Sequence, residues 1–291
     1  MNGLEAFPAP AKLNLMLRVL GRRPDGYHRL QTIFRFLDYG DEVRLRVRED
    51  GAIRRLTAIP GIPADDDLSV RAARLLQTAT GTGKGAEIDL TKRLPQGGGL
   101  GGGSSDAATV LLALNHLWGT GLGRAELQAL ALELGADVPV FVFGESAVGE
   151  GVGELLTPIS LPRAWYVVLI PEAAVATARI FADPELKRDS KPIKIQGFSV
   201  VGCSANAEAA DAEAAVNDLQ DLVCRLYPEV ARHLEWLSQY GPARMTGSGA
   251  CVFSAFETEP AARAVLAKAP ETMRGFVARG LDRHPLRALA D

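Results

Sequence analysis

Cysteine is scarce in this sequence, and the few cysteines form no pattern. The chain has only Cys203, Cys224 and Cys251, accompanied by four scattered histidines. Three thiols at irregular spacing do not make a disulfide framework, and the histidines do not supply the paired spacing of a zinc site. We therefore expect neither structural disulfides nor zinc, and a reducing compartment.

Positive charge is not in excess. The 32 Lys and Arg residues stand against 35 Asp and Glu residues, which gives a formal charge of −3, and no long basic run occurs. Nucleic-acid binding depends on clustered cations that neutralise phosphates. We therefore expect no nucleic acid among the partners.

Long apolar runs are also missing. Residues 1–10 contain neither a basic stretch nor an apolar core of a secretion signal, and no later segment reaches the length of a membrane span. We expect no membrane association and a cytoplasmic location, as a monomer or a homodimer.

The composition is that of an ordinary globular protein, with 47% hydrophobic and 23% charged residues. A length of 291 residues exceeds the usual size of one domain, so two domains are expected. Pro158 and Pro162 precede a strand-like segment at residues 165–170. We place the boundary there, which gives an N-terminal domain of residues 1–160 and a C-terminal domain of residues 161–291.

The first domain opens with strand patterns. Residues 11–20 alternate and predict a half-buried strand, with leucines on one face and Lys12 and Asn14 on the other. A second apolar stretch to residue 37 and a strand at residues 43–47 follow. Helical spacing then predicts helices, which we place at residues 67–78, 104–118 and 124–134.

The second domain alternates helix and strand. Patterns at residues 230–240 and 259–267 predict helices, and those at 250–256 and 276–278 predict strands, which makes the fold class α+β. Residues 203–216 are rich in Ala, Glu and Asp and form either a surface helix or an insertion.

A glycine-rich loop precedes the predicted helix at residues 104–118. Six glycines fall within residues 95–105. Glycine adopts positive φ and lets a ligand approach the backbone closely, and the first turn of a helix offers free N–H groups and a positive dipole end. We therefore expect this loop to bind the phosphates of a nucleotide. The residues assigned to that role are Pro95, Gln96, Gly97, Gly98, Gly99, Leu100, Gly101, Gly102, Gly103, Ser104 and Ser105.

The glycines also allow other interpretations. Residues 81–85 do not form a P-loop, because Lys84 is followed by Gly85 instead of Ser or Thr. Gly97, Gly99 and Gly102 match the dinucleotide fingerprint, yet no acidic strand end follows about 20 residues later. A Rossmann oxidoreductase, a nucleotide- or RNA-binding module and a plain flexible linker remain alternatives to a kinase.

Several residues outside the loop are candidates for chemistry. Lys12 and Asn14 share the polar face of the first strand, where solvent exposure is the plain explanation. Asp137 follows a helix end and either acts in catalysis or caps the next turn. Tyr27 and His28, after a Pro-Asp-Gly turn, either stack on a heteroaromatic base or pack at the turn.

A second small-residue loop, at residues 245–250, enters a strand and contains Thr246 and Gly247. Taken alone it is consistent with a tight turn. Two glycine-rich segments in one chain suggest a ligand held from both domains, so we expect Thr246 and Gly247 to contact the substrate.

Five motifs in this order resemble one family. They are Pro10-Ala11-Lys12-Leu13-Asn14, Asp25-Gly26-Tyr27-His28, the loop at residues 95–105, Gly135-Ala136-Asp137-Val138-Pro139 and Thr246-Gly247-Ser248-Gly249. Together they resemble the GHMP kinase superfamily and, within it, the kinases that act on 4-diphosphocytidyl-2-C-methyl-D-erythritol.

The resemblance implies a two-domain GHMP kinase fold, with a β-rich N-terminal domain and a ferredoxin-like C-terminal domain. It implies ATP as co-substrate, Mg²⁺ as cofactor, and a cytidyl-methylerythritol as the small-molecule substrate. Lys12 and Asp137 match the catalytic pair, and Asn14, Tyr27 and His28 match substrate contacts. No residue is assigned as a metal ligand, although Ser105 and Asp106 are candidates.

The sequence departs from the family at one point. The resemblance implies a second aromatic against the cytosine, shortly before a pair such as Asn217-Asp218, but the two preceding residues here are Ala215 and Val216. The source of that second aromatic face stays open at this level.

Overall fold

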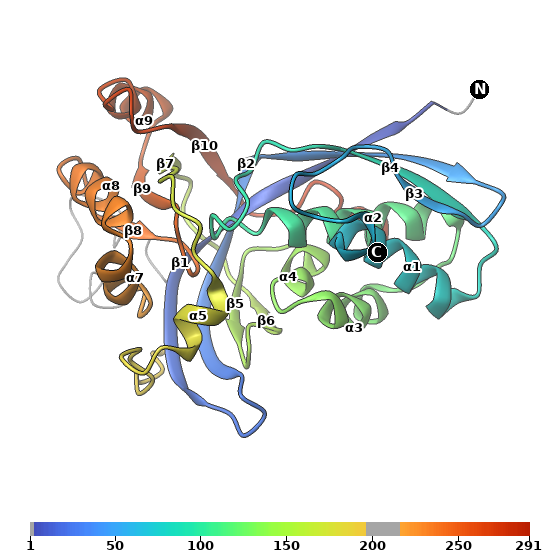
Figure 1. Ribbon diagram of the computed structural model, residues 1–291, viewed down its shortest axis with the longest axis horizontal. Coiled ribbons are helices and arrows are strands. Elements are labelled where there is room, and N and C mark those ends of the chain that lie inside the picture. The colour runs from blue at the N-terminus through green and yellow to red at the C-terminus, as the bar shows by residue number, and fades with distance from the viewer. Residues whose placement is uncertain (1–2, 196–215) are drawn as a thin grey trace.

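The computed structural model describes residues 3–195 and 216–291, and Figure 1 shows their course. The strands are β1 (Glu5–Arg22), β2 (His28–Arg48), β3 (Ile53–Arg55), β4 (Gly85–Thr91), β5 (Ala147–Glu150), β6 (Leu155–Pro158), β7 (Trp165–Leu169), β8 (Ala243–Met245), β9 (Val252–Phe256) and β10 (Gly275–Leu281). The helices are α1 (Leu68–Thr80), α2 (Gly102–Trp118), α3 (Arg124–Leu134), α4 (Val138–Phe143), α5 (Thr177–Ala182), α7 (Gln220–Leu226), α8 (Pro228–Ser238) and α9 (Glu259–Leu266), with 3₁₀ turns η1 (Ala64–Asp66) and η3 (Arg287–Ala290). Of the ambiguous segment 203–216, all but Val216 lies outside the described residues.

The strands of the described residues join one sheet. Its main path runs β3-β4-β2-β10-β7-β9-β8, β1 and β5 pair with β2, and β6 pairs with β5. The second and third predicted strands form a single long strand, β2, which makes an antiparallel hairpin with β1. Near the C-terminus, β10 pairs antiparallel with both β2 and β7 and so connects the two parts of the sheet.

Strand β1 is buried on both faces, so the prediction of a half-buried strand is wrong. Its apolar face has Leu13 and Leu15 with no exposed surface, and on the other face Lys12 and Asn14 are only 2% and 3% exposed. The glycine-rich loop covers this polar face, where the Lys12 amide donates to the Leu100 carbonyl at 2.9 Å. The alternation of residues within one strand cannot show that a loop from a distant part of the sequence covers its polar face.

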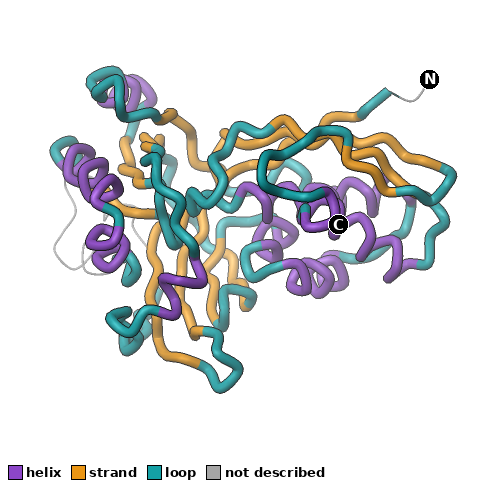
Figure 2. Tube along the Cα trace, in the orientation of Figure 1, coloured by secondary structure: helices purple, strands orange, loops and turns teal. Residues whose placement is uncertain are grey.

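Helices α1 to α4 lie together on one side of the β2 and β4 strands (Figure 2). Residues 105–115 of α2 are all buried, and their apolar side chains share a core with Phe34 of β2. A helix that is apolar nearly all round is typical of such a central position. At the start of α1, Asp67 accepts a hydrogen bond from the Ser69 amide at 2.8 Å, and α3 ends before Gly135 as predicted.

The later part of the chain packs helices against strands β7 to β9. Val167 and Val252 from the strands form a core with Leu222, Leu237 and Val265 from α7, α8 and α9. The α+β prediction is confirmed. The boundary at residue 160 stays a prediction.

The dinucleotide alternative does not fit this topology. Helix α2 is followed by α3 and α4 instead of a strand, and β5, the next strand, pairs antiparallel with β2. A Rossmann unit requires a parallel strand after the helix. The glycine loop therefore belongs to a different kind of phosphate site.

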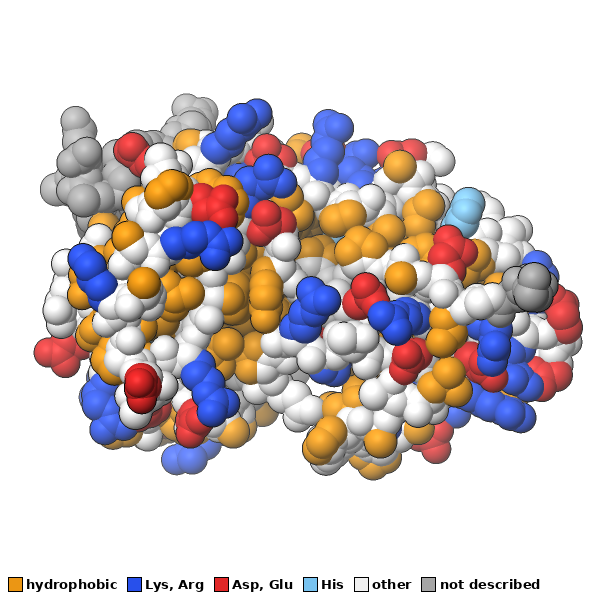
Figure 3. Space-filling view, turned by 90° about the horizontal axis from the view of Figure 1, so that it is seen from above, with side chains coloured by type: hydrophobic (Ala, Val, Ile, Leu, Met, Phe, Trp, Pro, Cys, Tyr) orange, Lys and Arg blue, Asp and Glu red, His pale blue; other side chains and the backbone are white. Residues whose placement is uncertain are grey.

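The surface mixes both signs of charge. On the face in Figure 3, Lys and Arg side chains are interspersed with Asp and Glu and do not gather in one basic field. Within residues 3–195 and 216–291, no helix is long and apolar enough to cross a bilayer.

Candidate active site

A cavity of about 510 Å³ opens beside the glycine-rich loop. Strands β1 and β2 contribute Lys12, Asn14 and Phe34 to its wall, and α5 contributes Phe181. The loop before α2, the turn before α4 and the loop after β8 also contribute to the wall. Its volume is in the range of small-molecule sites, and its lining comes from segments far apart in the sequence.

The glycine loop has the backbone conformation that requires glycine. Gly97, Gly99 and Gly101 have φ of 66°, 74° and 72°, in the left-handed region. A Cβ on Gly99 would lie 2.2 Å from the Thr246 carbonyl oxygen, so a side chain has no room there. The loop therefore brings bare backbone close to the loop after β8.

Helix α2 begins earlier than predicted, at Gly102 and not at Ser104 or Ser105. Its first-turn amides therefore include those of the last loop glycines, which lie at the cavity. A helix N-terminus with free N–H groups is suited to bind an anion.

Most of the loop residues assigned to phosphate binding line the cavity, and two do not. The lining residues are Pro95, Gln96, Gly97, Gly98, Gly99, Gly101, Gly102, Gly103 and Ser104. Leu100 is 1% exposed and packs in an apolar cluster with Leu13. Ser105 is fully buried, and its hydroxyl donates to the Pro10 carbonyl at 2.7 Å. In this position Ser105 connects α2 to β1 and does not line the cavity.

Lys12 and Asp137 meet at the cavity. The Lys12 Nζ lies 3.1 Å from Asp137 Oδ2 and donates to Asn14 Oδ1 at 2.6 Å. Lys12 is buried, whereas the Asp137 side chain is 43% exposed and makes no capping hydrogen bond to α4. Asp137 therefore presents a carboxylate to both the ammonium and the cavity, and the capping interpretation does not hold.

Asn14 is held in one orientation. Its Nδ2 donates to Thr32 Oγ1 at 2.8 Å, and the Thr32 hydroxyl donates to the Met16 carbonyl at 2.6 Å. Because the amide nitrogen is used in this way, the amide oxygen must face Lys12. Thr32 therefore positions Asn14, and no pattern in the sequence indicates this contact.

Thr246 connects three segments. Its Oγ1 accepts from the Asn14 amide at 2.9 Å and donates to the Gly99 carbonyl at 3.2 Å. Thr246 is fully buried and does not line the cavity, whereas Gly247 does. Of the two predicted substrate contacts in this loop, only Gly247 is placed to touch a ligand.

Tyr27 and His28 lie at the far end of the β1–β2 hairpin, and neither lines the cavity. The Tyr27 side chain is 62% exposed, while His28 is buried and packs on Phe181, with ring centroids 5.0 Å apart. Burial lowers the pKa of His28, and the guanidinium groups of Arg188 and Arg22 lower it further. A neutral imidazole and a benzyl ring therefore adjoin the cavity at this end.

Phe181 is an aromatic side chain that lines the cavity. It comes from α5 and not from the residues before Asn217. Asn217 instead donates to the Met245 and Gly247 carbonyls at 2.8 Å each, and Asp218 accepts from the Val19 amide at 2.7 Å. No periodic signal in the sequence distinguishes Phe181 from a core aromatic, because its place at the cavity and its contact with His28 depend on the tertiary structure.

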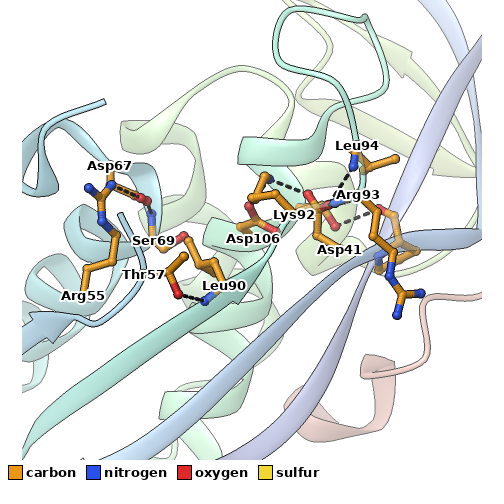
Figure 4. A network of polar contacts seen from close by, with 12 residues as sticks. Asp41, Arg55, Thr57, Asp67, Ser69, Leu90, Lys92, Arg93, Leu94 and Asp106 are labelled. Carbon is orange, nitrogen blue, oxygen red and sulfur yellow. Dashed lines mark hydrogen bonds and ion pairs between the residues drawn. The ribbon is translucent and has the colours of Figure 1, made fainter. Parts of the chain in front are cut away.

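A charged cluster lies near the loop, at the start of α2 (Figure 4). The Lys92 ammonium is paired with Asp41 and, at 2.5 Å, with Asp106. Burial raises the pKa of Asp106 to about 7, against the lowering effect of Lys92. Burial would lower the pKa of Lys92, but the carboxylates of Asp106 and Asp41 raise it above its ordinary value. Only Asp106 of this cluster was anticipated, as a possible metal contact.

Lys92 and Asp106 also line the cavity, together with the apolar side chains of Ile59, Ile62 and Leu68. One Asp106 oxygen, Oδ1, is buried without a hydrogen-bond partner. Among the described residues no group of three or more His, Cys, Asp or Glu is arranged to hold a metal ion.

The sequence matches two kinase families in order. The family described as "GHMP kinases N terminal domain" matches residues 67–145, and "GHMP kinases C terminal" matches residues 202–275. The solved structure of a mevalonate kinase from Methanococcus jannaschii aligns over 96% of this chain and 99% of that one, with a TM-score of 0.64 and 15% identity, which shows the fold alone.

Closer relatives carry one name. The 4-diphosphocytidyl-2-C-methyl-D-erythritol kinase of Thiobacillus denitrificans is 62% identical over 97% of each chain, and that of Nitrosospira multiformis is 58% identical over 98% of this chain and 94% of its own. A crystal structure of 4-(cytidine 5'-diphospho)-2C-methyl-D-erythritol kinase aligns with a TM-score of 0.79 at 34% identity, covering 95% of this chain and 99% of that chain. The two-domain GHMP kinase fold, with its ferredoxin-like C-terminal domain, is confirmed by these matches. The chain is therefore a small-molecule kinase and belongs to the 4-diphosphocytidyl-2-C-methyl-D-erythritol kinase family.

Proposed function

We propose that this protein transfers the γ-phosphoryl group of ATP to the 2-hydroxyl of 4-diphosphocytidyl-2-C-methyl-D-erythritol. The products are the 2-phosphate and ADP, a step of the non-mevalonate route to isopentenyl diphosphate. The observation that carries the proposal is the meeting of Lys12 and Asp137, 3.1 Å apart, on a cavity that the glycine loop also lines. The relatives' shared name supports the choice of substrate.

The loop end of the cavity suits a nucleotide. The amides at residues 97–103 and the N-terminus of α2 offer donors and a positive dipole end to the phosphates. The apolar side chains of Ile59, Ile62 and Leu68, which line the cavity, offer a place for the adenine ring. Binding of ATP in this position directs the γ-phosphate toward Lys12.

Mg²⁺ fits a site with few protein ligands. The Ser104 hydroxyl is an oxygen donor that lines the cavity beside the loop. Mg²⁺ usually keeps several waters and binds one or two carboxylates together with nucleotide phosphates, so a dedicated protein cage is not required. When bound, the ion would neutralise charge on the phosphate oxygens.

The catalytic step needs alignment and charge stabilisation more than covalent chemistry. The substrate oxygen forms a bond to the γ-phosphorus, the bond to the ADP oxygen breaks, and the hydroxyl proton passes to Asp137. Because a carboxylate is a weak base, it takes the proton late, when bonding to phosphorus has acidified the hydroxyl. Neutralised Asp137 then leaves the Lys12 ammonium free to stabilise the moving phosphoryl oxygens.

The far end of the cavity suits the cytidyl group. Phe181 lines the cavity and packs against His28, and Tyr27 stands exposed at the same hairpin end. Flat aromatic side chains stack on a base, and the imidazole adds a polar contact. We assign Phe181 as the second aromatic face that the residues before Asn217 do not supply.

One assay tests the substrate. ADP release is measured with ATP and Mg²⁺ and with the cytidyl-methylerythritol substrate, mevalonate or homoserine as acceptor. Turnover with the first acceptor alone is expected, with the new phosphate on the 2-hydroxyl by mass spectrometry and NMR. Turnover with mevalonate or homoserine and none with the cytidyl substrate would refute the proposal.

A further inference from the structure

Arg188 connects the His28 side chain to the backbone of Phe181, at the end of the cavity proposed for the cytidyl group. Its Nε donates to His28 Nε2 at 3.1 Å, and its Nη2 donates to the backbone carbonyls of Phe181 at 3.0 Å and Asp183 at 2.5 Å. Its Nη1 donates to the Leu186 carbonyl at 3.1 Å. One guanidinium thus bridges the start of β2 to the end of α5 and the loop after it.

The contact to His28 determines which nitrogen of the imidazole carries the proton. Arginine has only donors and stays protonated in proteins, so the Nε2 atom that receives its N–H must use its lone pair. An imidazole whose Nε2 accepts is neutral and has its proton on Nδ1. Arg188 therefore selects the Nδ1–H tautomer of His28.

The surroundings keep His28 in that neutral form. The side chain is 7% exposed and is covered on one side by the Phe181 ring. The charged groups facing it, Arg188 and Arg22, are both cations and oppose a second proton on the ring. His28 is therefore a pure hydrogen-bond donor through Nδ1, for which no bond to a described residue occurs.

A fixed Nδ1–H donor distinguishes the two common pyrimidines. Cytosine presents acceptors at both O2 and N3, whereas uracil carries a proton on N3. If the base lies against His28, an Nδ1–H donor at its N3 edge would make a hydrogen bond with cytosine and would meet a second donor in uracil. Sites that hydrogen-bond one base in this way reject an analogue whose polar group is left unpaired.

We propose that Arg188 is a positioning residue which, by fixing the tautomer of His28 and the place of Phe181, makes the site select a cytidine over a uridine nucleotide. This inference rests on the proposed function, since it assumes that the base of the substrate binds between these residues.

The tautomer is measured without substrate. Protein labelled with ¹⁵N-histidine gives ring signals for four histidines, and His28→Gln identifies those of His28. Long-range ¹H–¹⁵N correlation spectra are expected to show a protonated Nδ1 and an unprotonated Nε2 for His28 near neutral pH. In Arg188→Met the signals should move to a mixture of tautomers. A protonated Nε2 in the wild type would overturn the inference.

Selectivity is measured by the ratio of kcat/KM for the cytidyl substrate to that for its uridyl analogue. In Arg188→Met this ratio is expected to fall about tenfold or more, mainly through a higher KM for the cytidyl substrate. Arg188→Lys keeps one donor for His28 but not the planar fork, so it should restore part of the ratio. An unchanged ratio in a folded Arg188→Met would overturn the inference.

Arg225→Met is the matched control. Arg225, in α7, pairs at 2.9 Å with Glu185, which lies in the same loop as Arg188. The pair is on the exposed surface, and Arg225 makes no contact with His28. In Arg225→Met, the His28 signals and the ratio of kcat/KM values are expected to match those of the wild type. An equal fall of this ratio in Arg188→Met and Arg225→Met would refute a specific role for Arg188. If circular dichroism shows that Arg188→Met does not fold, the inference is judged by the tautomer of His28 in the wild type and by the kcat/KM ratio of Arg188→Lys. If the wild type phosphorylates neither nucleotide, the proposed function fails, while the tautomer measurement still judges the Arg188 contact.

Discussion

At the scale of single residues, the Lys12–Asp137 pair is the centre of the proposed chemistry. Asp137→Asn keeps the shape of the side chain and removes the proton acceptor, and Lys12→Ala removes the ammonium. Each change should lower kcat by about 10²-fold or more. Steady-state ADP release measures the loss.

A folding control accompanies these variants, because Lys12 is buried and bonded to Asn14. Both variants should keep the wild-type circular dichroism spectrum and bind ATP, as judged by thermal stabilisation. Wild-type turnover in either folded variant would contradict the assigned roles.

Asp106 makes the stability of the protein depend on pH. Burial raises its pKa in the folded protein to about 7, above the value in the unfolded chain. Between these two pKa values the folded state holds a proton that the unfolded state has lost. The free energy of unfolding should therefore fall as pH rises, by up to about 1.4 kcal/mol per pH unit.

Asp106→Asn removes that titration. The stability of this variant relative to the wild type should increase as pH rises from about 5 to about 8. Urea unfolding at several pH values measures the difference. A difference between the two proteins that does not change with pH would show that Asp106 stays ionised throughout.

At the scale of an element, the backbone of the glycine loop packs closely against the loop after β8 and also lines the cavity. Gly99→Ala puts a Cβ 2.2 Å from the Thr246 carbonyl oxygen at a φ of 74°. The loop must shift to accommodate it, so we expect a loss of about 1–3 kcal/mol in stability and a higher KM for ATP. Urea unfolding and ATP titration of the rate give the two values.

Gly103→Ala is the comparison within the same segment. Its Cβ would meet only the Leu68 Cδ1 at 3.7 Å, and the residue lies in α2. Alanine is the better helix former, so stability should stay level or rise by up to about 1 kcal/mol. Equal losses in both variants would show that the loop glycines serve flexibility and not close packing.

At the scale of the whole molecule, Thr246 connects β1, the glycine loop and the loop after β8. Thr246→Val leaves the buried Asn14 amide and the Gly99 carbonyl without their partner. Unpaired buried groups should lower the free energy of unfolding by about 1–3 kcal/mol. Urea unfolding checks the value, and turnover should fall because Asn14 orients Lys12.

Thr177→Val serves as the stability control for that variant. Thr177 is exposed, and its hydroxyl bonds to Ser248 at 2.6 Å. Its change in stability should stay within about 0.5 kcal/mol. A comparable loss in both variants would mean that the hydroxyl of Thr246 has no special connecting role.

Local signals in the sequence predicted much of the fold. The end of α3 at Gly135, the helical spacing of α1 and the glycine run before α2 each depend on neighbouring residues along the chain. The start of α2 was placed too late because its first turn contains glycines, which have weak helix propensity. The α+β class followed from the same local patterns.

The periodicities, the turn residues and the candidate groups can be derived from the sequence alone, because backbone preference and side-chain alternation act over a few neighbouring residues. Tertiary contacts bury Lys12 and pair it with Asp137, bring Phe181 to His28, and place Lys92 between two carboxylates. These contacts join residues far apart in the chain, and burial and electrostatic pairing depend on distance in space and not on separation along the sequence.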